Sequence, residues 1–522
     1  MKKYILSLLT LTVFLTACND FETLEINPNI PTSAPASLVL QGVLSTMNDG
    51  AWNDIMRYNQ FYCSNYNYYS NNEYNWSGAS LTYTTLKNVA KMEEEALKGG
   101  AKAVNPYSAL GKFLRAYYFT QMTLRVGDLP LKEALKGLEA DKPKYDSQKE
   151  IFVQVLKWLE EANTDFTTLV AAGDNSLVGD YYFNGNLRQW QRAVNALKLR
   201  ILIHLSKKSD DTELKVKQEF ANVLSNPTKY PLMTNNSDNL QFRWNSFNKY
   251  SRNQDNYGFN ATRENMAKTY VDLLKNNQDP RLLVVAEPAG TALKAGKSYT
   301  DFTAYEGASS GEDLADMSTK AGVDNGAGVP IGSYSFQNRK RYYTSYEGES
   351  TIILGYAEQC FSIAEAINRG WTTGNAEDFY NKGIEASMSF YGLKEGDNAL
   401  TFSKDGGIAN FVTATYKFDK TAFFGQKSVK YAGNTTEGLT QILNQKYVAF
   451  FMNSGYEAYF NWRRTGVPTF LTGPGTGNGT KIPRRFQYPA TELNVNKDNI
   501  TAALSTQFGG KDDINADMWV LK

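Results

Sequence analysis

The sequence predicts a mainly α-helical protein, in which a stacked helical-repeat scaffold carries a large irregular, loop-rich insertion and few short strands. Apolar residues recur at helical spacing in paired segments over about 37–224 and again over about 350–470. Between them, over about 225–349, glycine, asparagine, serine and aromatic residues dominate. Paired amphipathic helices with short polar links are typical of stacked repeats, although the pairs follow no fixed period.

The N-terminal segment has the features of a secretory signal. Lys2 and Lys3 precede an apolar run over residues 4–14, which is too short to span a bilayer. Leu15-Thr16-Ala17-Cys18 then resembles a bacterial lipobox, where the cysteine is lipidated and becomes the mature N-terminus. We expect residues 1–17 to be a signal peptide and Cys18 to be the lipidation site. The alternative is an ordinary signal peptide in which Cys18 has no role.

Downstream of Cys18 the sequence predicts a tether and one large folded unit. Residues 18–36 are polar and contain three prolines, which predicts an extended tether. Residues 37–522 are expected to form a single domain, with a loop-rich tail over 471–522. Removal of residues 1–17 changes the charge count from 55 basic and 54 acidic residues to 53 and 54. Such a balance gives no overall field for nucleic acid or anionic lipid, so membrane attachment through the N-terminus alone is expected.

The histidine and cysteine content restricts the catalytic possibilities. His204 is the only histidine and lies in a strongly apolar helical segment, so a structural role is expected and a multi-histidine zinc site is excluded. Cys63 and Cys360 lie far apart in the sequence; a disulfide is possible after export, but a buried free thiol is favoured for Cys360. No cofactor, metal site or catalytic residue is predicted. Hydrolysis by a pair of carboxylates stays open because Asp and Glu are plentiful.

Helix start and stop signals delimit most scaffold elements. Asn105-Pro106 and the capping box Ser147-x-x-Glu150 predict two helix starts, and Asn186 predicts a third. Apolar spacing predicts further helices over 37–56, 263–275, 356–368, 376–391 and 436–460.

The stretch from Tyr58 to Trp76 has the most unusual local composition. Aromatic residues alternate irregularly with asparagines, without helical or strand periodicity, so a loop is expected. Aromatic faces beside amide groups suit flat ligands with polar edges, such as sugar rings. The competing interpretation is an aromatic loop that folds back into the core. Two further aromatic clusters, near Trp244 and near Tyr346, lie in the irregular segment.

Several short motifs, taken in order, resemble one family. They are Gly127-Asp128-Leu129-Pro130, Pro143-Lys144-Tyr145-Asp146-Ser147-Gln148, Tyr356-Ala357-Glu358, Ala364-Glu365-Ala366, Arg369-Gly370-Trp371, Trp462-Arg463-Arg464-Thr465-Gly466, Ile482-Pro483-Arg484-Arg485-Phe486 and Tyr488-Pro489, followed by Glu492 and Asn496. Together with the lipobox, they resemble the SusD/RagB family of outer-membrane lipoproteins along the whole chain.

The resemblance implies a tetratricopeptide-like scaffold and a surface-exposed lipoprotein. Such a protein would capture a nutrient, usually an oligosaccharide and sometimes a peptide, and deliver it to a TonB-dependent outer-membrane transporter. It would be a binding protein and not an enzyme. Binding of oligopeptides by the same scaffold and a surface glycoside hydrolase that uses two carboxylates are the alternatives.

The resemblance also indicates which regions bind the ligand: the loop after the first helix and the irregular segment. Both coincide with the aromatic stretches, and loops on a rigid scaffold often carry function. The candidate ligand-binding residues are Tyr66, Asn67, Tyr68, Tyr69, Asn72, Tyr74, Asn75, Trp76, Trp244, Tyr257 and Tyr346. The arginines of the late motifs, Arg463, Arg464, Arg484 and Arg485, are expected to be structural.

Overall fold

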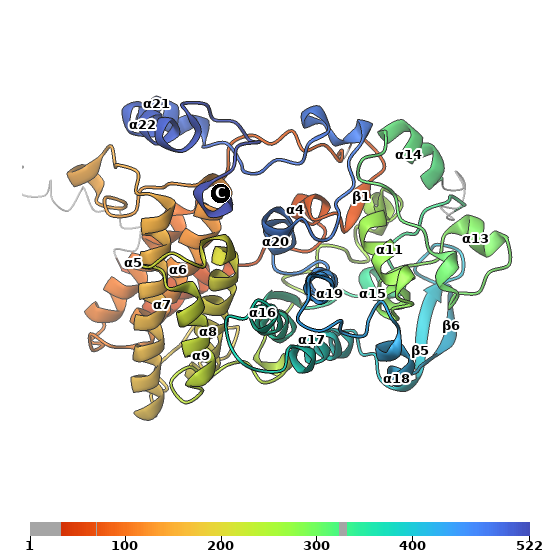
Figure 1. The fold of residues 1–522 in the computed structure, drawn as a ribbon, viewed down its shortest axis with the longest axis horizontal. Helices are drawn as coiled ribbons and strands as arrows, with labels where there is room; N and C mark the ends of the chain where they lie inside the picture. Colours follow the sequence, from red (N-terminus) through yellow and green to blue (C-terminus); the bar gives the residue numbers. More distant parts are fainter. Residues whose placement is uncertain (1–32, 69, 323–330) are drawn as a thin grey trace, which may run out of the picture.

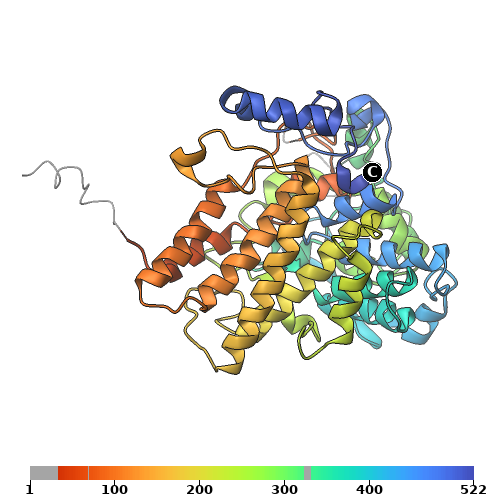
Figure 2. The ribbon, with the colours of Figure 1, turned by 60° about the vertical axis from the view of Figure 1, so that its left-hand side comes forward.

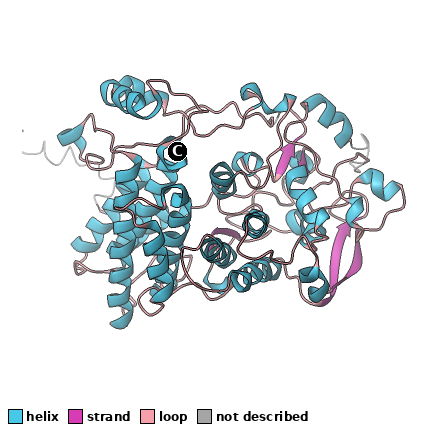
Figure 3. Ribbon diagram, in the orientation of Figure 1, coloured by secondary structure: helices cyan, strands magenta, loops and turns pink. Residues whose placement is uncertain are grey.

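Amphipathic helices pack side by side to form the scaffold (Figure 1). The structure is a computed structural model and describes residues 33–68, 70–322 and 331–522. Figure 2 shows the N-terminal helices as neighbouring rods, and Figure 3 shows how few strands accompany them. The scaffold helices are α3 (Ala36–Ser45), α4 (Asp54–Tyr58), α5 (Tyr83–Lys98), α6 (Pro106–Val126), α7 (Gln148–Ala171), α8 (Leu187–His204), α9 (Val216–Ser225), α16 (Tyr356–Asn368), α17 (Ala376–Phe390), α19 (Thr436–Ala449) and α20 (Glu457–Thr465).

The predicted caps begin these helices. The Asn105 side chain accepts a hydrogen bond from the backbone N–H of Ser108 at 3.0 Å, and the Ser108 hydroxyl accepts one from the N–H of Asn105. Ser147 and Glu150 form the same reciprocal pair at the start of α7. The backbone N–H groups of a first helical turn have no partner within the helix, so these side chains satisfy donors that would otherwise lack one.

Two helices predicted as continuous are interrupted. The prediction over 37–56 is wrong between the end of α3 at Ser45 and the start of α4 at Asp54, where Trp52 has a positive φ of 63°. The prediction over 436–460 is wrong in its centre, since α19 ends at Ala449 and α20 begins at Glu457. Met452 and Ser454 between them have positive φ values of 57° and 59°. A left-handed backbone cannot continue a right-handed helix, so apolar spacing alone misplaced both ends.

The irregular half contains short elements rather than a sheet. Its helices are α10 (Tyr257–Asn260), α11 (Lys268–Asn276), α12 (Arg281–Val285), α13 (Gly290–Lys294), α14 (Leu314–Ala321) and α15 (Arg339–Tyr343). Three antiparallel pairs join β1 (Tyr62–Ser64) to β3 (Glu264–Met266), β2 (Leu240–Phe242) to β4 (Thr351–Leu354), and β5 (Gly396–Ser403) to β6 (Phe411–Phe418). Residues 264–266, predicted as helix, form β3.

Several elements were not predicted. They are α5, α9, the β5–β6 hairpin, α18 (Lys420–Gly425), α21 (Ala490–Val495) and α22 (Lys497–Phe508). The tail is therefore partly helical and not only loops. Short 3₁₀ helices cover Gly137–Ala140, Leu205–Lys208, Asn236–Asp238, Phe302–Ala304, Pro474–Thr476, Asn478–Thr480 and Trp519–Leu521.

Buried ion pairs connect α8, α16 and α20. Because α16 places Glu358 and Glu365 seven residues apart, both carboxylates lie on the face towards these helices, as their spacing predicts. The ion pairs are Arg200–Glu358 and Arg464–Glu365. Burial lowers the pKa of His204, so His204 joins α8 to α20 through a hydrogen bond to Glu457. The Nε2 atom of His204 lies 2.8 Å from a Glu457 carboxylate oxygen in the core, so the structural role expected for His204 is confirmed.

Both described cysteines are buried and free, so the thiol expected at Cys360 is confirmed and no disulfide joins it to Cys63. Cys63 lies on β1 beside the Ala308 carbonyl and the Ser310 hydroxyl. Among the described residues, no helix is both long and apolar enough to cross a membrane. Cys18 lies outside the described residues.

Candidate ligand-binding surface

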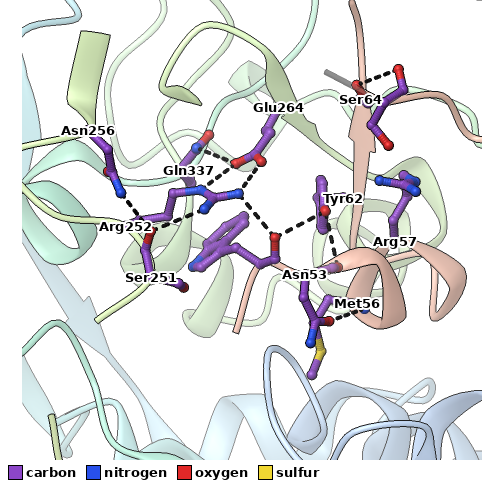
Figure 4. A network of polar contacts seen from close by, with 12 residues as sticks. Asn53, Met56, Arg57, Tyr62, Ser64, Ser251, Arg252, Asn256, Glu264 and Gln337 are labelled. Atoms are coloured by element: carbon purple, nitrogen blue, oxygen red, sulfur yellow. Dashed lines mark hydrogen bonds and ion pairs between the residues drawn. The ribbon is translucent and has the colours of Figure 1, made fainter. Parts of the chain in front are cut away.

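A polar network fixes the first aromatic loop against the irregular half (Figure 4). β1 pairs with β3, where Ser64 faces Glu264. Glu264 accepts hydrogen bonds from two guanidinium nitrogens of Arg252, one of them at 2.8 Å. Arg252 also donates to the backbone carbonyl of Trp52 at 3.0 Å, and that carbonyl accepts a hydrogen bond from the Tyr62 hydroxyl. Because this bidentate pair is largely buried, it holds three chain segments in one arrangement.

Directly after β1, aromatic side chains reach the surface. Tyr68 is 81% exposed, and Tyr66 and Asn67 are also exposed. The Tyr66 and Tyr68 rings lie 6.4 Å apart, and the Arg263 guanidinium lies 4.2 Å from the centre of the Tyr66 ring. We refer to Tyr66, Asn67, Tyr68 and Arg263 as the Tyr66 surface. It offers aromatic faces, an amide and a cation to a ligand. Tyr69 lies outside the described residues.

The second half of the same stretch faces inwards. Tyr74 is 1% and Trp76 6% exposed, and Asn72 is buried, whereas the residues between them are exposed. This alternation is the period of an extended strand, which was not recognised in the sequence. Asn72 bonds both the N–H and the carbonyl of Ser64, and the Tyr74 hydroxyl donates to the Tyr58 carbonyl. We therefore correct the expectation for Asn72, Tyr74 and Trp76, which belong to the core.

Asn75 is exposed, but its amide already has protein partners. Its Oδ1 accepts the backbone N–H of Asn478 at 2.8 Å, and its Nδ2 donates to Glu73 at 2.6 Å. The side chain therefore anchors the C-terminal tail against the loop. This arrangement favours a structural role over the ligand contact that was expected.

A second exposed aromatic group lies in the irregular half. Phe247 is 94% exposed at the tip of a tight turn, and half-buried Trp244 donates its indole N–H to Thr351. The Tyr346 hydroxyl donates to Asp255 at 3.0 Å, and Lys249 lies 4.2 Å from the centre of the Tyr346 ring. We refer to Trp244, Phe247, Lys249, Asp255 and Tyr346 as the Trp244 surface. Asp255 lies three residues after Arg252, so the polar network and the Trp244 surface share one chain segment.

Tyr257 belongs to neither surface. It is half-buried, its hydroxyl donates to the Gly406 carbonyl, and its ring packs edge-on against Tyr343. The hydroxyl thus ties α10 to the turn of the β5–β6 hairpin, which argues against the ligand contact expected for Tyr257.

The arginines of the late motifs bind protein groups, and the structural role predicted for them is confirmed. Arg463 donates to the Arg484 carbonyl, and Arg464 pairs with Glu365. Arg484 and Arg485 pair with Asp517 and Asp512. Across the described ranges, no group of three or more His, Cys, Asp or Glu side chains is placed to hold a metal ion.

Comparisons with known proteins assign the fold and the class of protein. The family model SusD-like_2, described as starch-binding associating with outer membrane, matches residues 29–489. The chain belongs to the SusD-like family. No curated protein sequence gives a significant match. The SusD-like fold is tetratricopeptide-like and mainly helical, as predicted. SusD-like proteins are outer-membrane nutrient- or glycan-binding proteins and not enzymes.

Solved SusD-like structures cover nearly the whole chain. A SusD homologue from Bacteroides fragilis is 30% identical, with a TM-score of 0.80, and the alignment covers 94% of this chain and 100% of that one. An outer-membrane protein from Bacteroides vulgatus, to which a part in nutrient binding has been ascribed, is 31% identical with a TM-score of 0.77 and the same coverage. A chitin-binding SusD homologue from Flavobacterium johnsoniae shares the fold, with 20% identity, a TM-score of 0.65 and coverage of 95% and 96%.

Four members of these surfaces were missed as site residues in the sequence: Phe247, Lys249, Asp255 and Arg263. Phe247 was noticed only as part of an aromatic cluster, although the Asn-Ser-Phe-Asn turn around it could have indicated an exposed tip. Arg263 was read as part of a helix. Its place above Tyr66 depends on the pairing of β1 with β3, and no local pattern predicts such a long-range pairing.

Proposed function

We propose that this SusD-like protein is a lipid-anchored, outward-facing lipoprotein that captures an oligosaccharide and delivers it to a partner TonB-dependent outer-membrane transporter. The observation that supports it best is the presence of two exposed aromatic groups, the Tyr66 surface and the Trp244 surface. The Arg252–Glu264 pair fixes the segment that carries the first of them. Exposed aromatic rings on a surface are costly in water and are typical of binding sites.

The chemistry of the two surfaces suits a glycan. The C–H face of a sugar ring packs against Tyr66, Tyr68 and Phe247, which together supply the apolar contact area. Hydroxyl groups at the ring edge need hydrogen-bond partners, which Asn67, Lys249 and Asp255 offer. The chitin-binding and starch-binding descriptions of relatives agree with such a ligand.

The proposal includes a lipid anchor and the tether that follows it. Residues 1–17 would be removed as the signal peptide, Cys18 would carry the lipid, and residues 18–36 would connect it to the domain over 37–522. At about 3.3 Å per extended residue, that tether spans tens of ångströms. The domain would then move over its transporter as a lid while its scaffold (37–224 and 350–470), irregular part (225–349) and tail (471–522) stay together.

The test is calorimetry of the purified full chain in detergent against panels of neutral oligosaccharides and of oligopeptides. We expect binding of at least one glycan. In the Tyr66→Ala/Tyr68→Ala double variant this binding should fall by about tenfold or more, because central aromatic contacts carry much of the energy of such interfaces.

Leu138→Ala is the matched control, since Leu138 is also exposed but lies in the 3₁₀ helix Gly137–Ala140, outside both surfaces. It should bind like the wild type. Tight peptide binding with no glycan binding would overturn the proposed ligand class, and undiminished glycan binding by the double variant would overturn the proposed surface.

A further inference from the structure

A cavity of about 410 Å³ lies where α12, α15, the C-terminal end of α17 and strand β5 meet. Ligand-binding cavities usually measure about 300–1,000 Å³, so it has room for one or two sugar rings. None of its lining residues belongs to the Tyr66 surface or the Trp244 surface. Figure 1 labels α15, α17 and β5, three of the elements at or next to which its lining residues lie. We call it the Lys340 cavity.

The charge of this cavity is unbalanced. Lys340, Arg341 and Lys394 line it together with one acidic residue, Asp397. Both lysines are exposed, and neither ammonium group forms an ion pair within the part of the chain that the structure describes. A second cavity, of about 400 Å³, is lined by four lysines and three glutamates, and Lys198, one of these lysines, pairs with Glu160 and Glu219. The excess positive charge in the Lys340 cavity favours an anion.

Arg341 provides the geometry for recognising an oxyanion. Its Nε donates to Glu349 at 2.7 Å, and its guanidinium lies 5.0 Å from the centre of the Tyr391 ring. These contacts hold the side chain. Its two Nη groups donate no hydrogen bond to any described residue, while Arg341 still lines the cavity. A guanidinium held in this way presents its N–H groups in a planar fork that matches a carboxylate or a sulfate group.

Apolar residues also line the cavity. Val284 is half-buried and Ala399 is exposed, whereas Leu283, Leu400 and Tyr391 are buried. The polar side chain of Asn338 is already used, since it accepts the N–H of Arg341 and donates to the Thr401 carbonyl. A small inorganic ion would leave Val284 and Ala399 uncovered, whereas a sugar ring would pack on them through its C–H face.

We propose that the Lys340 cavity binds the carboxylate or sulfate group of an acidic saccharide, as a site separate from the two aromatic surfaces. Arg341 and the two lysines contact the charged group, and Val284 and Ala399 contact the ring. The saccharide part of this inference rests on the proposed function, while the preference for an anion rests on the charges of the cavity.

The experiment titrates the full chain in detergent with glucuronic acid, glucose 6-sulfate, glucose and inorganic sulfate, using calorimetry. We expect the two acidic sugars to bind and glucose to show no heat of binding over the same concentration range. In the Lys340→Glu/Lys394→Glu double variant, affinity for the acidic sugars should fall by about tenfold or more, because like charges replace the attraction. Both lysines are exposed, so the variant should fold.

Lys87→Glu is the control, because Lys87 is an exposed, unpaired lysine on α5. It should bind as the wild type does. Equal binding of the acidic sugars by the wild type and the double variant would overturn the site. If inorganic sulfate bound as tightly as glucose 6-sulfate, the proposal that the ligand is a saccharide would be overturned. The Tyr66→Ala/Tyr68→Ala variant should still bind the acidic sugars. The tyrosine variant therefore tests the proposed function, and the lysine variant tests this inference.

Discussion

The indole of Trp76 lies parallel to the ring of Phe486, with centroids 4.0 Å apart and 7° between the ring planes. Tyr58 and Tyr459 pack edge-on against the same indole. Trp76 thus joins the first aromatic loop to the C-terminal tail, and its faces are covered by protein. Trp76, whose side chain could stack on a sugar ring if it were exposed, is therefore part of the core.

Replacing Trp76 should therefore affect stability. Trp76→Ala is expected to lower the free energy of unfolding by about 3–5 kcal/mol, the usual cost of removing a buried aromatic side chain. Tyr68→Ala should change it by less than about 0.5 kcal/mol, because Tyr68 is mostly exposed. Denaturant titration followed by circular dichroism measures both. A Trp76→Ala variant as stable as the wild type would contradict the core assignment.

Phe247 tests the second aromatic surface. Phe247→Ala should weaken binding of the glycan found in the calorimetric panel by about tenfold, since an exposed ring contributes to binding and little to folding. The melting temperature should stay unchanged because the side chain is almost fully exposed. Val495→Ala, an exposed apolar residue on α21, is the control. Unchanged glycan affinity in the Phe247 variant would remove the Trp244 surface from the site.

Acid should weaken the scaffold through Glu365. Burial by itself raises the pKa of Glu365, but Arg464 and Arg369 outweigh it and lower the pKa to about 2. The folded pKa is below the unfolded value of about 4.3, so the stabilisation is complete above pH 4.5 and is lost as the pH falls towards 2. It amounts to about 3 kcal/mol.

The measurement is the free energy of unfolding at pH 7 and at pH 2.5. Glu365→Gln should be destabilised at pH 7 by about 3–5 kcal/mol, because Arg464 loses its buried partner. On acidification it should lose less stability than the wild type does. Glu437→Gln, an exposed residue on α19, is the control and should retain the wild-type acid dependence. If the wild type and Glu365→Gln lost the same stability on acidification, the Arg464–Glu365 pair would be ruled out as the cause of that loss.

The two buried thiols should be unreactive in the folded protein. Burial raises the pKa of Cys63 to about 12 and that of Cys360 to about 12. At pH 8 the thiolate fraction would then be roughly one in ten thousand, and the thiolate is the reactive form. Alkylation followed by peptide mass spectrometry should find both cysteines unmodified in the native protein and modified after denaturation. Rapid native labelling of Cys360 would contradict its burial.

The anchor can be tested by fractionation. Cys18→Ala should move the protein from the membrane fraction to the soluble fraction, because the proposed lipid would be attached to that thiol. Cys63→Ser is the matched control and should stay in the membrane fraction, since Cys63 lies inside the folded domain. Persistent membrane attachment of the Cys18 variant would count against lipidation.

Local sequence signals predicted most of the scaffold because helix formation is governed within a few residues. Asn105, Ser147 and Asn186 each cap the helix that they were expected to start. Two helices were predicted too long, and each prediction was wrong in a segment where a residue, Trp52 or Ser454, has a left-handed backbone conformation. Those conformations are set by packing, and bulky or polar residues give little warning of them.

The sequence by itself determined the helical scaffold and the SusD-like motifs, since each depends on residues close together in the chain. Only the tertiary structure decided which aromatic residues are available to a ligand. Tyr68 and Trp76 stand in one stretch of similar composition, yet the first faces water and the second stacks on Phe486. The physical reason is that exposure depends on which distant segment covers a side chain, and β1, β3 and the tail meet only in the folded protein.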